Sequence, residues 1–202
     1  MTFVMGPAEA GPRRTTQMAS PKLKARLAGV FYLLNIVTGA LALFFAGGRP
    51  AAISIATLCY LVVTLLFYDL FKPVNRNLSL IAALFSLAGC VIGILNAFHL
   101  VADQINLVFF GFYCLVIGYL IVRSTFLPKV LGVLMAIGGV GWVSFVSPPL
   151  ANQLSPFNMF PGILGEAALT IWLLAVGVNV QRWNESAAKA SKSASLSATY
   201  FL

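Results

Sequence analysis

Long apolar runs separated by short polar connections occupy most of this 202-residue chain. The central example is residues 107–142, where two apolar runs flank a basic connection that contains Arg123 and Lys129. Because an α-helix rises about 1.5 Å per residue, each run is long enough to cross a hydrocarbon core of about 30 Å. The pattern therefore predicts two membrane-spanning helices that are joined on one side.

The same pattern along the whole chain predicts an all-α fold, a polytopic membrane protein with a bundle of six transmembrane helices. We expect a disordered tail at residues 1–22, the transmembrane domain at 23–183 and a flexible tail at 184–202. An uncharged, proline-containing connection at 148–161 is expected to lie along the interface. The expected spans are residues 27–46, 51–71, 78–98, 105–122, 130–147 and 162–180.

The composition agrees with a lipid environment. The chain is 60% hydrophobic and only 9% charged, whereas soluble domains have about 45–50% apolar and about 25% charged residues. Its net charge of +8 would also suit nucleic acid, but the basic residues lie between apolar runs and form no stripe. We therefore predict the lipid bilayer as a partner and no nucleic acid. The cysteines, each inside an apolar run, indicate neither disulfides nor a zinc site.

The basic residues also predict an orientation. With the N-terminus in the cytoplasm, twelve of the thirteen Lys and Arg residues are cytoplasmic and only Arg49 is external. This bias favours a multi-pass protein of the bacterial cytoplasmic (inner) membrane with both termini cytoplasmic. In a five-span alternative the last apolar run lies flat, and the cations after it are exported. The twelve are Arg13, Arg14, Lys22, Lys24, Arg26, Lys72, Arg76, Arg123, Lys129, Arg182, Lys189 and Lys192.

Four polar residues near the outer boundary form a candidate site. Asn96, His99 and Asp103 are spaced i, i+3 and i+7, so they share one stripe if the third helix continues past its apolar run. Glu166 enters the sixth span from the same side. One imidazole and two carboxylates suit a proton-binding or metal-binding site. In the alternative interpretation, His99 and Asp103 are solvated loop residues and Glu166 bonds to neighbouring helices or headgroups.

Other polar and small residues are predicted to join helices. Asn35 lies deeper, near Tyr32, and is expected to bridge helices by a hydrogen bond, with a ligand contact as the alternative. Small residues that share a helix face, such as Gly111 and Gly118, permit close packing between membrane helices. The aromatic residues of the spans are interpreted as packing or interfacial groups.

Catalytic motifs are absent from the sequence. It has no HExxH, no GxSxG, no P-loop and no GxGxxG. One histidine cannot supply both axial ligands of a haem within one chain, although a His/Met pair remains open. We therefore predict no enzyme activity, no catalytic residue, no bound metal and no cofactor.

The hairpin nevertheless resembles a known family. The segments that carry the resemblance are Phe109-Phe110-Gly111, Gly118-Tyr119-Leu120-Ile121, Arg123-Ser124, Leu127-Pro128-Lys129 and Leu131-Gly132-Val133-Leu134. They are similar to the bacterial integral-membrane family catalogued as domain of unknown function 4386. Weaker similarity at Arg26-Leu27-Ala28-Gly29-Val30 and at Gly165-Glu166 extends the resemblance to about residues 26–180.

This resemblance implies a six-span membrane protein in which Glu166 is the family's recurring glutamate, and it implies no activity. The chain departs from the family pattern at three places. Members often have histidine where Tyr113 stands, an acidic residue near Ser144 and a longer first exterior loop.

Three functions follow as hypotheses. We favour a non-enzymatic membrane protein that acts through contacts with a membrane-protein partner or in a homo-oligomer, because small-residue faces are many and intramembrane ionisable groups are few. The alternative is a small transporter or proton/ion-linked permease that uses the polar cluster around Glu166. A metal-containing membrane enzyme has the least support.

Overall fold

Helices make up the ordered architecture of the protein. The computed structural model describes residues 20–44, 48–98, 100–101 and 105–199, and these ranges contain helices and no strand. The six longest bundle elements are α1 Pro21–Phe44, α2 Arg49–Phe71, α3 Arg76–Ala97, α4 Ile105–Arg123, α5 Lys129–Val143 and α7 Phe160–Ala175. The 3-10 turn η2 Ser144–Val146, the short helix α6 Pro148–Leu154 and the terminal helix α8 Val180–Thr199 complete the chain. The all-α polytopic class is thus confirmed.

The helix boundaries follow local sequence signals. Proline stands in the first turn of α2, α6 and α7, where its missing N–H costs no helical hydrogen bond. Asn75 caps α3, because its side-chain oxygen accepts a hydrogen bond from the backbone N–H of Leu78 at 3.0 Å. All six predicted spans coincide with helices, although the connection predicted at 148–161 contains α6.

The sixth span is shorter than the sequence predicted. Helix α7 ends at Ala175, and the chain turns at Gly177, whose φ of 77° favours glycine. Five helices are individually long and apolar enough to cross a membrane, and α7 becomes the sixth only when it is taken together with α8, from which it is bent by 102°. The prediction that this span continues to residue 180 is therefore wrong.

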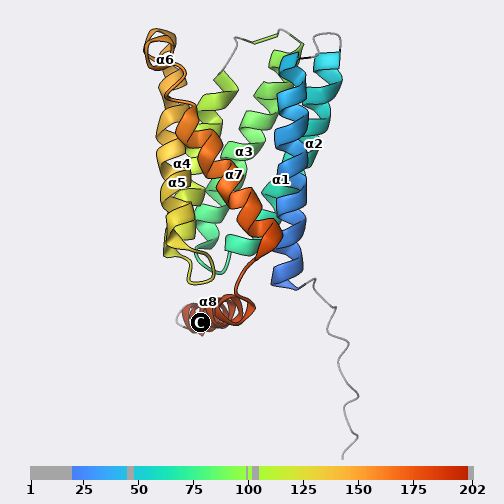
Figure 1. Cartoon of the computed structure of the whole chain (residues 1–202). Helices are drawn as coiled ribbons and strands as arrows, with labels where there is room; N and C mark the ends of the chain where they lie inside the picture. The colour runs from blue at the N-terminus through green and yellow to red at the C-terminus, as the bar shows by residue number, and fades with distance from the viewer. Residues whose placement is uncertain (1–19, 45–47, 99, 102–104, 200–202) are drawn as a thin grey trace, which may run out of the picture.

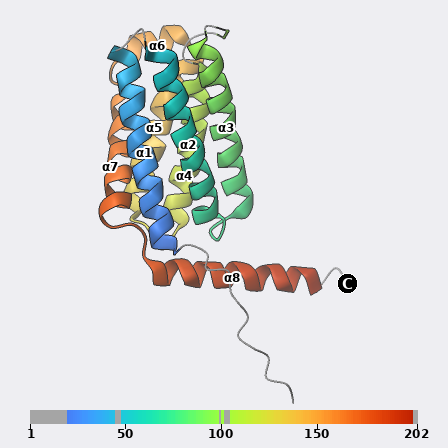
Figure 2. The same ribbon diagram turned by 90° about the vertical axis from the view of Figure 1, so that its right-hand side faces the viewer.

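The six bundle helices form a closed ring. Each packs against its chain neighbours from α1 to α5, and α7 closes the ring by packing between α5 and α1 (Figures 1 and 2). Figure 1 shows α7 crossing the bundle at a tilt. As a result, α3 and α7 stand on opposite sides of the ring.

The outside of the ring is apolar, and so is most of its core. Leu58, Leu65 and Ile171 are 63%, 68% and 65% exposed, as expected for side chains that face lipid. The largest fully buried side chains include Tyr32 and Tyr113. The surface thus suits a hydrocarbon solvent, and the most distinctive polar groups lie inside.

Helices α4 and α5 approach each other closely through their small residues. A Cβ atom placed on Gly118 would lie 2.7 Å from the carbonyl oxygen of Gly132 and 2.9 Å from the backbone nitrogen of Ala136. The two backbones therefore touch directly, which allows dispersion contacts that lipid cannot replace.

We expect Gly118→Ala to destabilise the protein by about 1–3 kcal/mol, because the added methyl group pushes α4 away from α5. Gly39→Ala is the matched control, since a Cβ there has nothing within 4 Å. Thermal unfolding of both variants in the same detergent measures the difference. Equal midpoints for the two variants would contradict the close packing.

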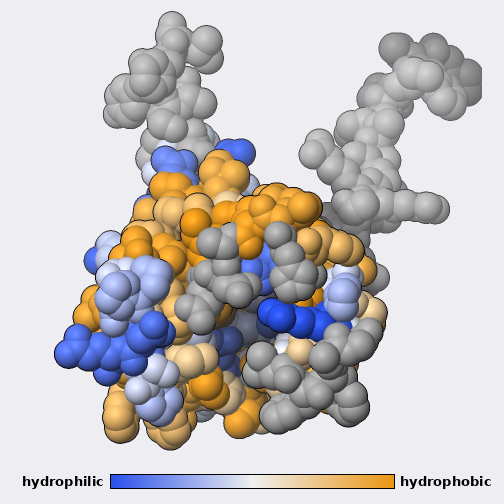
Figure 3. Space-filling model, turned by 90° about the horizontal axis from the view of Figure 1, so that it is seen from above, coloured by the Kyte–Doolittle hydropathy of each residue, from blue (hydrophilic) through white to orange (hydrophobic). Residues whose placement is uncertain are grey.

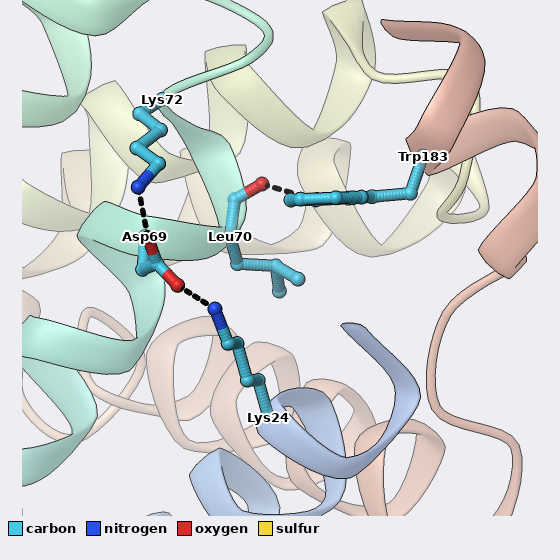
Figure 4. Close-up of polar contacts among 5 residues, drawn as sticks. All are labelled: Lys24, Asp69, Leu70, Lys72 and Trp183. Carbon is cyan, nitrogen blue, oxygen red and sulfur yellow. Dashed lines mark hydrogen bonds and ion pairs between the residues drawn. The ribbon is translucent and has the colours of Figure 1, made fainter. Parts of the chain in front are cut away.

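At the opposite end from α6, charged and aromatic groups join three helices (Figure 4). The carboxylate of Asp69 in α2 forms ion pairs with Lys24 of α1 and with Lys72. Trp183 of α8 donates its indole N–H to the backbone carbonyl of Leu70 at 2.9 Å. Residues 184–199, predicted as part of a flexible tail, instead continue helix α8, because its first turns are tied to the bundle.

Candidate functional site

Glu166 lies on the inner face of α7. The buried residues of this helix include Gly162, Leu169, Thr170 and Leu173, and the i+3, i+4 spacing puts Glu166 on the same face. Glu166 itself is half-buried, so part of the side chain remains reachable by a molecule as small as water. A carboxylate thus occupies the interior of a ring of apolar helices.

Side chains from four other helices lie within electrostatic range of this carboxylate. Glu166 interacts electrostatically with Tyr32 of α1, with Tyr60 of α2 and with Tyr113 of α4. The indole N–H of Trp142 in α5 also lies close to the carboxylate, although the two groups do not reach hydrogen-bond geometry. We call Glu166, Tyr32, Tyr60, Tyr113, Trp142 and Thr170 the Glu166 cluster.

The three tyrosine rings of the cluster touch one another edge to face. Their centroids are 6.0 Å apart between Tyr32 and Tyr60, and 5.6 Å apart between Tyr60 and Tyr113. This geometry is the favourable one for aromatic pairs, because ring edges are positive and faces negative. The rings therefore fix the positions of the three hydroxyl groups.

The polar atoms of the cluster are buried and unpartnered. Among the described residues, no partner with good hydrogen-bond geometry exists for the hydroxyls of Tyr32, Tyr60, Tyr113 and Thr170 or for Trp142 Nε1, although the hydroxyls of Tyr60 and Tyr113 lie close enough to interact. An unpartnered buried polar group costs about 1–3 kcal/mol, and buried polar groups normally have partners. The bundle interior therefore combines one carboxylate with five polar atoms that make no well-aligned hydrogen bond.

Further polar groups lie between the cluster and the α6 end of the bundle. Asn158 donates its side-chain amide to Ser144 Oγ at 2.9 Å, and Ser144 donates to the carbonyl of Gly141 at 2.6 Å. Figure 3 looks onto this end and shows polar patches among apolar surface. Polar groups thus continue from Trp142 toward the end of the molecule that carries α6.

The structure describes only two of the four residues of the site predicted from sequence, Asn96 and Glu166. Asn96 is buried near the end of α3, on the side of the ring opposite α7, so the structure does not bring it to Glu166. His99 and Asp103 lie outside the described residues. The half-buried Asn35 amide has no hydrogen-bond partner among the described residues, so its helix-bridging role stays a prediction.

Metal ligands do not gather in the described part of the chain. There, no group of three or more His, Cys, Asp or Glu side chains is placed to hold a metal ion. The Glu166 cluster supplies one carboxylate, hydroxyls and an indole N–H, which are hydrogen-bonding groups. Its chemistry is therefore best suited to proton binding or to hydrogen bonding.

Fold and site together define a polytopic helical membrane protein with a carboxylate inside its bundle. The family model described as "Domain of unknown function (DUF4386)" matches residues 94–177, the part that contains the α4–α5 hairpin and Glu166. The resemblance seen at the hairpin is thereby confirmed.

A relative from Archaeoglobus fulgidus, described as an uncharacterized protein, is 28% identical over 153 residues, which are 67% of this chain and 90% of the relative. No solved structure matches the chain. Since this relative is archaeal, the bacterial origin stays a prediction.

We expect Tyr113→Phe to leave stability unchanged or to raise it by up to about 1 kcal/mol, because the lost hydroxyl has no protein partner and its burial is itself a cost. Thr64→Val is the control, since the Thr64 hydroxyl bonds to Ser86 Oγ at 2.5 Å and its loss should cost about 1 kcal/mol. Thermal unfolding of both variants in the same detergent measures the two changes in stability. A larger loss for Tyr113→Phe than for Thr64→Val would mean that the phenol is partnered.

Proposed function

We propose that this protein is a non-enzymatic, proton-linked membrane carrier in which Glu166 binds the proton. The proposal rests on one observation, a carboxylate held inside the ring among unpartnered polar atoms from five helices. Ionisable residues inside membrane bundles are costly, and they commonly belong to proton or ion pathways. This supports the permease hypothesis over a purely structural one.

The chemistry around Glu166 favours a proton as the bound species. Phenol hydroxyls donate to a carboxylate and accept from a protonated carboxyl, so the neighbours of Glu166 can serve both of its protonation states.

The hypothesis of action through helix contacts rests on faces of small residues and on the scarcity of ionisable groups in the spans. One of these faces is used within the chain, because Gly111 and Gly118 of α4 meet Val143 and Gly132. This face therefore does not point to a separate partner.

We also infer that the end carrying α8 faces the cytoplasm of the cell. Apart from Arg49, the described cations occupy the helix ends and connections on that side, and basic residues favour the cytoplasmic face. The α6 end is then external. The Glu166 cluster would exchange protons with the exterior through the polar groups around Trp142.

Replacing Glu166 by glutamine should abolish proton binding in the bundle, because the amide keeps the shape of the carboxyl but does not titrate. We expect pH-difference infrared spectra of the protein in lipid to lose a carboxyl band in Glu166→Gln. We also expect proton uptake into proteoliposomes, driven by a membrane potential, to fall to the level of empty vesicles.

Glu185→Gln is the matched control, because Glu185 is an exposed glutamate of α8. This variant should keep both the interior carboxyl band and the proton uptake. Retention of the band and of the flux in Glu166→Gln would refute the proposal.

A further inference from the structure

Helix α8 lies across the end of the bundle. It is bent by 102° from α7, and Figure 2 shows it running beneath the helices and past their edge. Since α1 to α5 cross the bilayer along the bundle axis, a helix at right angles to them runs parallel to the membrane surface. At 20 residues, it extends for about 30 Å along that surface.

Direct contacts set the depth of α8. Arg182 donates to the carbonyl of Thr125 at 3.2 Å, and the backbone N–H of Asn179 donates to the carbonyl of Phe126 at 3.1 Å. Trp183 is bonded to the carbonyl of Leu70 at the end of α2. Because Leu70 lies at the end of α2 and Phe126 lies in the connection between α4 and α5, these contacts hold α8 at the boundary between lipid and water.

The two sides of α8 differ in chemistry. Trp183, Ala187 and Ala190 are half-buried and follow helical spacing, whereas Lys189 and Lys192 are exposed. An amphipathic helix with low overall hydrophobicity and a basic polar face is typical of helices that lie in the interface plane. The half-buried side of α8 carries small alanines with little apolar area, so the long, flexible lysine side chains supply the stronger attraction to lipid.

We propose that α8 lies in the headgroup layer of the bilayer and binds anionic lipid headgroups through Lys189 and Lys192. Helix α8 carries three cations against the single acid Glu185, and the connections above it are basic too. Anionic lipids attract such a surface, whereas a second copy of the same positive face would be repelled. This assignment does not depend on the proposed role of Glu166.

The test uses the full chain, one copy per lipid nanodisc, in phosphatidylcholine alone or mixed with phosphatidylglycerol of the same acyl chains. Hydrogen–deuterium exchange of the amides in residues 187–193 is measured in both. We expect slower exchange with phosphatidylglycerol, by roughly fivefold for each lysine engaged, and a smaller difference at high salt.

The double variant Lys189→Gln/Lys192→Gln should lose the slowing of exchange by phosphatidylglycerol while its exchange in phosphatidylcholine stays unchanged. The double variant Lys189→Arg/Lys192→Arg, which keeps both charges, should show the same slowing as the wild-type protein. Arg49→Gln, at the other end of the bundle, should keep the full effect. Equal exchange of the wild-type protein in both lipids would overturn the proposal. Slower exchange that appears only when two copies share a nanodisc would also overturn the proposal, since α8 would then bind a second copy of the chain and not lipid.

Discussion

Hydrocarbon offers no hydrogen-bond partner, and this constraint governs the whole molecule. Polar side chains have to lie inside a closed arrangement of helices, and α7 provides the closure by packing between α5 and α1. Its close approach to α5 depends on glycine, since a Cβ on Gly165 would lie 3.0 Å from the backbone of Leu134. Helix α7 therefore both seals the interior and carries the Glu166 carboxylate inside it.

Aromatic rings fill much of the interior toward the α8 end. Their centroids are 5.7 Å apart between Phe67 and Phe71 and 5.9 Å apart between Phe71 and Phe126. Such aromatic packing resists the entry of water and ions. The buried hydroxyls of Thr64 and Ser86, which bond to each other at 2.5 Å, belong to the same interior.

Hydropathy predicted the fold well because each span is a local property of its own residues, as with α2 and α4. The site was predicted less well because it depends on which helices become neighbours. Spacing along the third span grouped Asn96 with His99 and Asp103, and Glu166 was added because it enters its span from the same side, but ring closure puts α3 and α7 on opposite sides. One signal in the sequence could have indicated a buried polar site. Tyr60 stands in the middle of its span, whereas interfacial tyrosines occur near span ends. The end of α7 at Ala175 was not predicted either, because the apolar sequence continues past Gly177.

The depth of the carboxylate follows from the same geometry. Glu166 is six residues from the start of α7, which is about 9 Å of helix rise, and α7 itself begins below the α6 end of the ring (Figure 1). Its neighbour Gly165 packs against the backbone of Leu134, which lies five residues from the start of α5 at Lys129 and nine residues from its end at Val143. Glu166 therefore lies well inside the bundle, away from the α6 end. A proton has to pass between several turns of packed helices to reach a carboxylate at this depth.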